Sequence, residues 1–460
     1  MISELPDDHL HTQSRCSPLS QCKAKSKERG GVSETRALSE PPHHAHNFRL
    51  AVLYMVFMRT GWIFKTESII MPAVLDVIGG AGWLRGCLPM LNRLGQSLPP
   101  MLTSDLVRGA RLKKLGLFST TSTMGVCFLL LAAIWAMTEG AKSWWLPIVF
   151  LLIYAVFFTA TGINMMILNT ISGKLIRVDR RGRLSLFGTV IGATVAVGCG
   201  WYFLNRWLVD GTGTGGPRAN FEMIFLFTGM TFSGAALVGL FLKEAPDEDQ
   251  AQRRGGKDLL LAAYEIFKTD RNFRRLAVIA ALFGMYLTLF PHYQRLGRDR
   301  LELGLSALIP WVLAQNIGAA LFSVPAGWLA DRYGNRLVIK STMLVLCIAP
   351  VLALAISWSA DLQPSWFTVV FGLLGLTPVA MRILNNYTLE IASHDEHPKY
   401  LSTLAFAIAA PPILLSPLIG ALIDSVGFEL IFAIVTVCVF AGWLMAFTLT
   451  EPRKQNAGSK

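Results

Sequence analysis

Charged side chains are scarce in this sequence. Only 16% of the 460 residues are Asp, Glu, Lys or Arg, whereas 53% are hydrophobic, and the mean hydropathy is +0.46. This balance is too apolar for a water-soluble protein of this size. Short alternating strands are also missing, because the apolar runs are continuous, which argues against a membrane β-barrel. The composition therefore predicts an all-α integral membrane protein.

Several chemical signatures are missing as well. No G-x-x-x-x-G-K-S/T loop is present, which argues against direct drive by ATP. The seven cysteines have no metal-binding or disulfide spacing. The sequence also has no cluster of His and Asp residues that would indicate a catalytic site. We therefore expect no cofactor, no bound metal and no enzymatic activity. Residues 1–47 lack an apolar core, so we expect a disordered cytoplasmic tail rather than a signal peptide.

Long apolar runs fill the rest of the chain, each able to cross a hydrocarbon core of roughly 30 Å. We predict twelve transmembrane helices. In the first half they cover 49–76, 82–103, 115–137, 145–171, 184–205 and 220–242. In the second half they cover 274–293, 307–329, 338–358, 365–388, 400–423 and 428–449.

The net charge of +12 comes from the loops, since the first 47 residues are balanced. We interpret this excess as a topology signal and not as a nucleic-acid surface, because Lys and Arg gather on the cytoplasmic side of membrane proteins. An even number of spans then predicts that both termini are cytoplasmic, in a plasma or inner membrane. The lipid bilayer is thus one expected partner.

The longest interior loop, 243–273, divides the helices into six and six. Its apolar residues recur at helical spacing, which predicts an amphipathic helix on the inner membrane surface; a disordered loop is the alternative. The predicted domains are a tail over 1–47, a six-helix bundle over 48–242, this linker, a second bundle over 274–450 and a tail over 451–460.

Residues 327–336 read G-W-L-A-D-R-Y-G-N-R between two apolar runs. The decamer resembles a loop motif of the major facilitator superfamily of secondary transporters. A weaker echo surrounds Asp105 in the first half, and Asn169 and Asn386 precede similar Leu-Ser pairs at equal spacing. The echo lacks the glycine and the Asp-Arg pair of the motif. The fifth span also has no Gly-Pro pair of the kind found in many proton-coupled drug exporters of the family.

This resemblance implies two pseudo-symmetric six-helix bundles that move about a central cavity. It also implies that the decamer and its echo act as gates through charge contacts with helix ends. The gating candidates are Asp105, Arg108, Gly327, Asp331, Arg332, Gly334 and Arg336. We expect the decamer to be the stronger brace of the two.

Polar residues inside the spans are costly in lipid and therefore indicate function. In the resembling family, spans one, four, seven and ten line the cavity, and many of these residues fall there. Arg59 and Arg382 predict an anionic substrate, because guanidinium groups bind carboxylate and phosphate. The substrate-binding candidates are Arg59, Glu67, Asn92, Gln96, Asn164, Asn169, His292, Arg382, Asn385 and Asn386.

Two alternatives remain open for these residues. The polar side chains could instead join helices to one another. Glu67 is a candidate for proton exchange, although it could also meet water or Lys65. Pro378 predicts a kink in the tenth span.

The sequence thus predicts a secondary active transporter that moves a small solute by alternating access. A coupling proton or ion is a further partner that this interpretation allows. The alternatives are a transporter-like membrane sensor and a membrane-embedded lipid-modifying enzyme.

Overall fold

The computed structural model describes residues 43–138, 141–208, 217–247, 265–359, 362–393 and 396–451. Chain contacts separate Met1–His44 from Ala45–Lys460, and the following concerns the second unit. Within the described ranges every regular element is a helix. The predicted all-helical class is confirmed.

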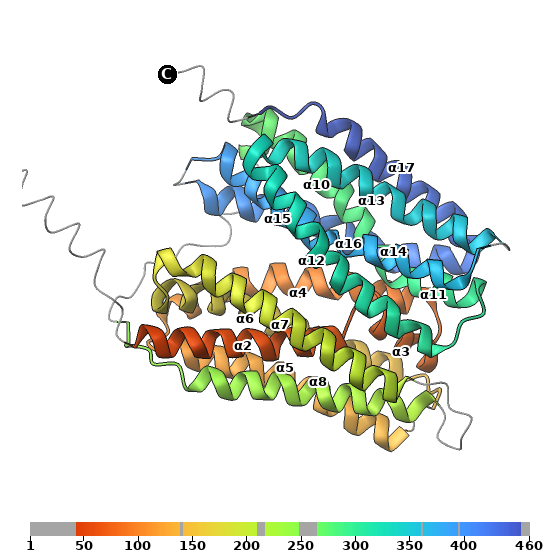
Figure 1. The fold of residues 1–460 in the computed structure, drawn as a ribbon, viewed down its shortest axis with the longest axis horizontal. Helices are drawn as coiled ribbons and strands as arrows, with labels where there is room; N and C mark the ends of the chain where they lie inside the picture. Colours follow the sequence, from red (N-terminus) through yellow and green to blue (C-terminus); the bar gives the residue numbers. More distant parts are fainter. Residues whose placement is uncertain are drawn as a thin grey trace, which may run out of the picture. The chain divides into compact units, whose positions relative to one another are not determined.

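Helices α2 to α8 form one group and α10 to α17 another (Figure 1). The first group contains α2 (His44–Phe64), α3 (Ile70–Ile78), α4 (Gly82–Gly109), α5 (Lys113–Thr138), α6 (Leu146–Leu175), α7 (Val178–Trp207) and α8 (Pro217–Leu240). The second contains α10 (Arg271–Leu287), α11 (Phe290–Arg300), α12 (Leu308–Tyr333), α13 (Asn335–Trp358), α14 (Phe367–Leu374), α15 (Thr377–Ile391), α16 (His397–Val426) and α17 (Phe428–Ala446), with short 3-10 turns at Leu305–Ala307 and Pro364–Trp366.

Ten helical segments of the described chain are long and apolar enough to cross a membrane. They match ten of the twelve predicted spans. Helices α2 and α4, of 21 and 28 residues, lie at the first two predicted spans but carry charged side chains along their length, among them Arg59 and Arg93. The described chain is therefore an integral membrane fold in which α4 is an unusually polar helix.

Three predicted spans are interrupted in the structure. The first breaks at residues 65–69 between α2 and α3, the seventh between Leu287 and Phe290, and the tenth between Leu374 and Thr377. A proline follows each break, at Pro72, Pro291 and Pro378. Proline lacks an amide hydrogen and its ring clashes with the carbonyl four residues earlier, so the preceding helix ends there. The expectation of one continuous first helix over 49–76 was wrong.

Residues 1–42 and 452–460 of the two predicted tails and most of the predicted linker helix lie outside the described residues, whereas residues 44–47 belong to α2. The described start of the linker binds the first helix group: Asp247 pairs with Lys113 and, at 2.7 Å, with Lys174. Hydrogen bonds from Lys113 and then Lys174 hold the pKa of Asp247 below its ordinary value. Lys174 also donates to Glu244 at 2.9 Å. These contacts attach the start of the linker to the first helix group.

Candidate functional site

A cavity of about 560 Å³ lies between the two helix groups. Its wall comes from α2, α4, α6 and α7 on one side, and from α12 and the ends of α10, α11, α14 and α15 on the other. All three helix breaks contribute to it, through residues such as Glu67, Phe290 and Thr377. Broken membrane helices are tolerated where the freed backbone faces a cavity. The proline-induced breaks thus place irregular, polar chain at the cavity.

The first break supplies four consecutive wall residues: Lys65, Thr66, Glu67 and Ser68. Its backbone is held locally, since the Thr66 hydroxyl donates to the Ile63 carbonyl at 2.7 Å and the Thr66 carbonyl accepts from the start of α3. The Ser68 hydroxyl donates to the Gln315 side chain of α12 at 2.6 Å. The break therefore touches both helix groups.

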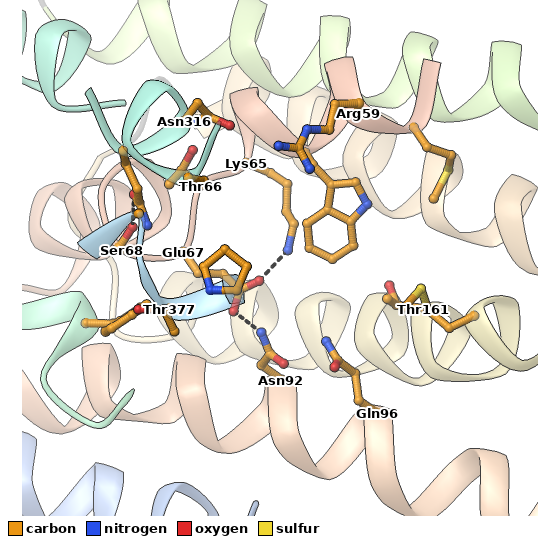
Figure 2. Close-up of a pocket in the computed structure, with 18 of the residues that line it drawn as sticks. Arg59, Lys65, Thr66, Glu67, Ser68, Asn92, Gln96, Thr161, Asn316 and Thr377 are labelled. Atoms are coloured by element: carbon orange, nitrogen blue, oxygen red, sulfur yellow. Dashed lines mark hydrogen bonds and ion pairs between the residues drawn. The ribbon is translucent and has the colours of Figure 1, made fainter. Parts of the chain in front are cut away.

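Glu67 lies between two donors from the first group (Figure 2). The Lys65 ammonium donates to one carboxylate oxygen at 2.5 Å, and the Asn92 amide donates to the other. Each oxygen of the carboxylate therefore accepts one hydrogen bond from the protein. The Glu67 side chain is 18% exposed, whereas that of Lys65 is fully buried.

An aromatic cage holds Lys65. Its nitrogen lies 3.7 Å from the ring centroid of Trp62, 4.5 Å from that of Phe158 and 4.8 Å from that of Phe157. Aromatic faces attract cations, most strongly when water is excluded. The cage keeps the ammonium at the wall, where it can reach Glu67 and is shielded from the cavity.

Two guanidinium groups line the same cavity, those of Arg59 and Arg93. Among the described residues neither forms an ion pair or a hydrogen bond, and Glu67 is the only acidic residue on this wall. Because Lys65 neutralises Glu67, the excess charge at the wall is positive. Unpaired guanidinium groups in a membrane need water or an anion.

The sequence and fold were compared with those of known proteins. A family model described as Major Facilitator Superfamily matches residues 295–460. The matched region is the last 166 of the 460 residues, and it includes the decamer. No curated protein matches the sequence.

Solved structures with the major facilitator fold cover most of this chain. The nucleoside transporter NupG has a TM-score of 0.65 at 13% identity, over 88% of this chain and 100% of its own. A bacterial homologue of the human lysosomal transporter Spinster gives 0.59 at 13%, over 89% and 98%. The E. coli fucose:proton symporter FucP gives 0.55 at 14%, over 89% and 99%. At these identities the likeness shows the fold alone.

Five of the predicted binding residues contribute to the cavity wall: Arg59, Glu67, Asn92, Gln96 and Asn164. Asn164 differs from the others because it is buried. Its amide donates to Thr121 at 2.7 Å and to Tyr54 at 3.0 Å. This residue joins α2, α5 and α6, as the helix-joining alternative anticipated.

The other five predicted binding residues lie away from that wall. Asn169 is exposed beyond it on α6, and His292 is fully buried on α11. Arg382, Asn385 and Asn386 form an exposed stripe on α15, and Arg382 lies close enough to Arg59 for electrostatic repulsion. The arginine that shares the cavity with Arg59 is thus Arg93.

An ion network joins the two groups at one end of the cavity, which we call the joined end. Arg85 of α4 donates to Asp76 of α3 at 2.5 Å and to Asp424 of α16 at 3.2 Å. Gln294 of α11 donates to Asp76 at 2.7 Å. Asp424 also accepts from the Gly82 amide at 2.5 Å, at the start of α4. Arg85 is therefore shared between the two halves.

Close backbone packing reinforces this network. A Cβ atom added at Gly86 would lie 2.1 Å from the Ser416 carbonyl oxygen. One added at Gly420 would lie 2.1 Å from the Gly82 carbonyl oxygen. Only glycine permits such an approach of α4 to α16.

The decamer lies at the opposite end, which we call the decamer end. Arg336 donates to the Phe447 carbonyl at 2.8 Å, and Arg332 lies over the rings of Trp328 and Tyr333. Gly334 has a φ of 90°, which L side chains rarely adopt, and ends α12. Gly327, Asp331 and Arg332 are exposed, as is Arg108, whereas Asp105 is half-buried. Gating by these residues stays a prediction.

Several residues of the site were not predicted from the sequence. Arg93, and Gln315, Asn316 and Thr377 of the second half, were not among the predicted binding residues. For Thr377 the sequence did offer a signal, because a proline follows each of the three helix breaks and Pro378 follows Thr377 directly. Asp76 and Asp424 lie near the ends of predicted spans, where charged residues are common.

Proposed function

We propose that this protein is a secondary transporter that carries a small organic anion by alternating access. The observation that carries the proposal is the pair of unpaired guanidinium groups, Arg59 and Arg93, in a cavity between two helix groups. A carboxylate or phosphate would satisfy both through charge-assisted hydrogen bonds.

Alternating access needs a cavity that is closed at one end at a time. The Arg85 network and the glycine contacts between α4 and α16 support a closed joined end. We propose that the joined end faces outward, with both termini in the cytoplasm. Further support comes from the similar solved structures, which include a nucleoside transporter and a fucose:proton symporter.

Solute flux into vesicles that contain the purified protein tests the proposal. A panel of anionic, neutral and cationic solutes would be offered under several imposed pH gradients, which also identifies any coupling proton. We expect saturable flux of an organic anion. Arg59→Gln and Arg93→Gln should each lower its apparent affinity by about tenfold or more, because each removes hydrogen bonds to a charged group.

The matched control is Arg206→Gln. Arg206 is exposed at the end of α7, with its guanidinium 5.1 Å from the Tyr202 ring, and does not line the cavity. Its substitution should leave flux unchanged. Flux of neutral or cationic solutes alone, or of an anion with equal affinity in wild type and Arg59→Gln, would contradict the proposal.

A further inference from the structure

Much of the cavity wall carries neutral hydrogen-bonding groups. The amides of Asn92, Gln96, Gln315 and Asn316 and the hydroxyl of Thr377 all contribute to it. In Figure 2 the Asn92 amide is joined to Glu67, and Gln96, Thr377 and Asn316 lie elsewhere on the wall. Asn92 donates to Glu67, Gln315 accepts from Ser68, and Asn316 donates to the Val312 carbonyl. An anionic group alone would use the two arginines and leave the Asn92 amide oxygen and the Thr377 hydroxyl, which have no partner among the described residues, unfilled. Polar groups of a closed site that stay unpaired cost affinity.

Glu67 is an acceptor with unused capacity. A carboxylate accepts about four hydrogen bonds, and Lys65 and Asn92 supply one to each oxygen. Its partly exposed side chain still reaches the cavity. The carboxylate can therefore accept further hydrogen bonds from a bound molecule.

The caged ammonium decides which kind of donor Glu67 would prefer. Lys65 neutralises the carboxylate at 2.5 Å, so the pair carries no net charge. Arg59 and Arg93 would repel an ammonium group on the substrate. A neutral donor such as a hydroxyl meets neither penalty.

We infer that the transported molecule is a hydroxylated organic anion, such as a hydroxy acid or a polyol phosphate. Its anionic group binds Arg59 and Arg93, and a hydroxyl donates to Glu67. Lys65 acts as a positioning residue that holds Glu67 in its acceptor role. This inference rests on the proposed function, because it assumes that the cavity binds an anion.

Binding of matched probe pairs to the purified protein, measured by calorimetry, tests the inference. Glycerol 3-phosphate is compared with propyl phosphate, and gluconate with hexanoate, so that each pair shares its anionic group and carbon number. Glucose is the uncharged probe. In the wild type we expect each hydroxylated anion to bind about tenfold to about a hundredfold more tightly than its partner, as expected for hydrogen bonds to a charged acceptor.

Two variants locate the effect. Glu67→Gln should lower the ratio of affinities between the hydroxylated anion and its partner in each pair. All anions should still bind more tightly than glucose. The double variant Lys65→Met with Glu67→Gln removes both charges, so it leaves no unpaired buried ion and guards against a simple folding failure. It should retain anion binding with the same narrowed ratio. Arg93→Gln should weaken all four anions together and preserve the ratio.

The outcomes separate the two proposals. If both members of each pair bind equally to the wild type, or if Glu67→Gln leaves the ratio unchanged, the hydroxyl inference is overturned and anion transport stands. If glucose binds as tightly as the anions, or if no anion binds, the proposed function fails as well.

Discussion

The two ends of the cavity are built differently from the same helices. At the joined end, α4 and α16 approach at Gly86 and Gly420 and share the Arg85 network. Toward the decamer end the same two helices carry exposed side chains, with Leu106 at 76% and Phe406 at 60% exposure. The close backbone approach of this helix pair is thus recorded at the joined end.

Helices α7 and α12 repeat this contrast. Near the joined end, Gly200 of α7 lies against Leu313 of α12. Toward the decamer end, Val190 of α7 and Val324 of α12 are exposed. The difference indicates that contact between the halves is concentrated at the joined end. If the protein alternates, the contacts there must break while others form at the decamer end, and substitutions at the two ends should act in opposite directions.

The largest effect should follow Arg85→Gln. Asp76 is buried and would lose its close cation, and removal of one partner from a buried ion pair costs on the order of 3–5 kcal/mol. We expect a lower midpoint of thermal unfolding and a wider distance between spin labels placed across the joined end. Arg206→Gln is the control. An unchanged distance would mean that the network does not hold this end closed.

Gly86→Val should act next most strongly. The added side chain meets the Ser416 backbone, which cannot move cheaply, and overpacking typically costs about 1–3 kcal/mol. We expect the joined end to open, with roughly a tenfold change in the ratio of the two states for each 1.4 kcal/mol. Gly198→Val is matched, because Gly198 lies in a helix with no atom near its Cβ position. Equal distance changes in both variants would point to a general helix effect.

Asp424→Asn should also favour opening of the joined end, but by less than Gly86→Val. The Asp424 side chain is 42% exposed, and exposed ion pairs contribute about 1 kcal/mol or less. Asparagine still offers an oxygen to the Gly82 amide, so only the charge on Arg85 is lost. Spin-label distances across both ends would measure the shift. A shift as large as that of Arg85→Gln would indicate that Asp424, and not Asp76, dominates the network.

Asp331→Asn should shift the equilibrium toward the state with a closed joined end, which is opposite to the effect of Asp424→Asn. The shift should also be smaller. If the decamer braces the state in which its own end is closed, weakening that brace favours the state described here. The same pair of distances should then report a more populated closed joined end and a slower transport rate. Movement in the same direction as Asp424→Asn would contradict a gating role for the decamer.

The sequence predicted the helical class, two helix groups and a polar cavity because apolar run length and intramembrane polarity are local signals. It did not predict the joined end. Arg85 and Asp424 are 339 positions apart, and nothing local pairs them. Both Arg382 and Arg93 lie within predicted spans, and only packing decides that Arg93 lines the cavity. The helix breaks were partly predictable: Pro378 was noted, whereas Pro72 and Pro291 carry the same information.

The smallest expected effect concerns Asp247, which binds residues of the first half only and should leave the distance between halves unchanged. Its pKa is lowered in the folded state, so its contribution is present above the ordinary value of about 3.9 and is lost as pH falls through the folded value. A spin label introduced by Ala245→Cys should therefore become more mobile only under acid conditions. The Asp247 side chain is 31% exposed, so water screens its ion pairs and the change in label mobility should be modest. With Asp247→Asn the label should be mobile at every pH, and an acid step that persists in this variant would assign the transition to another group.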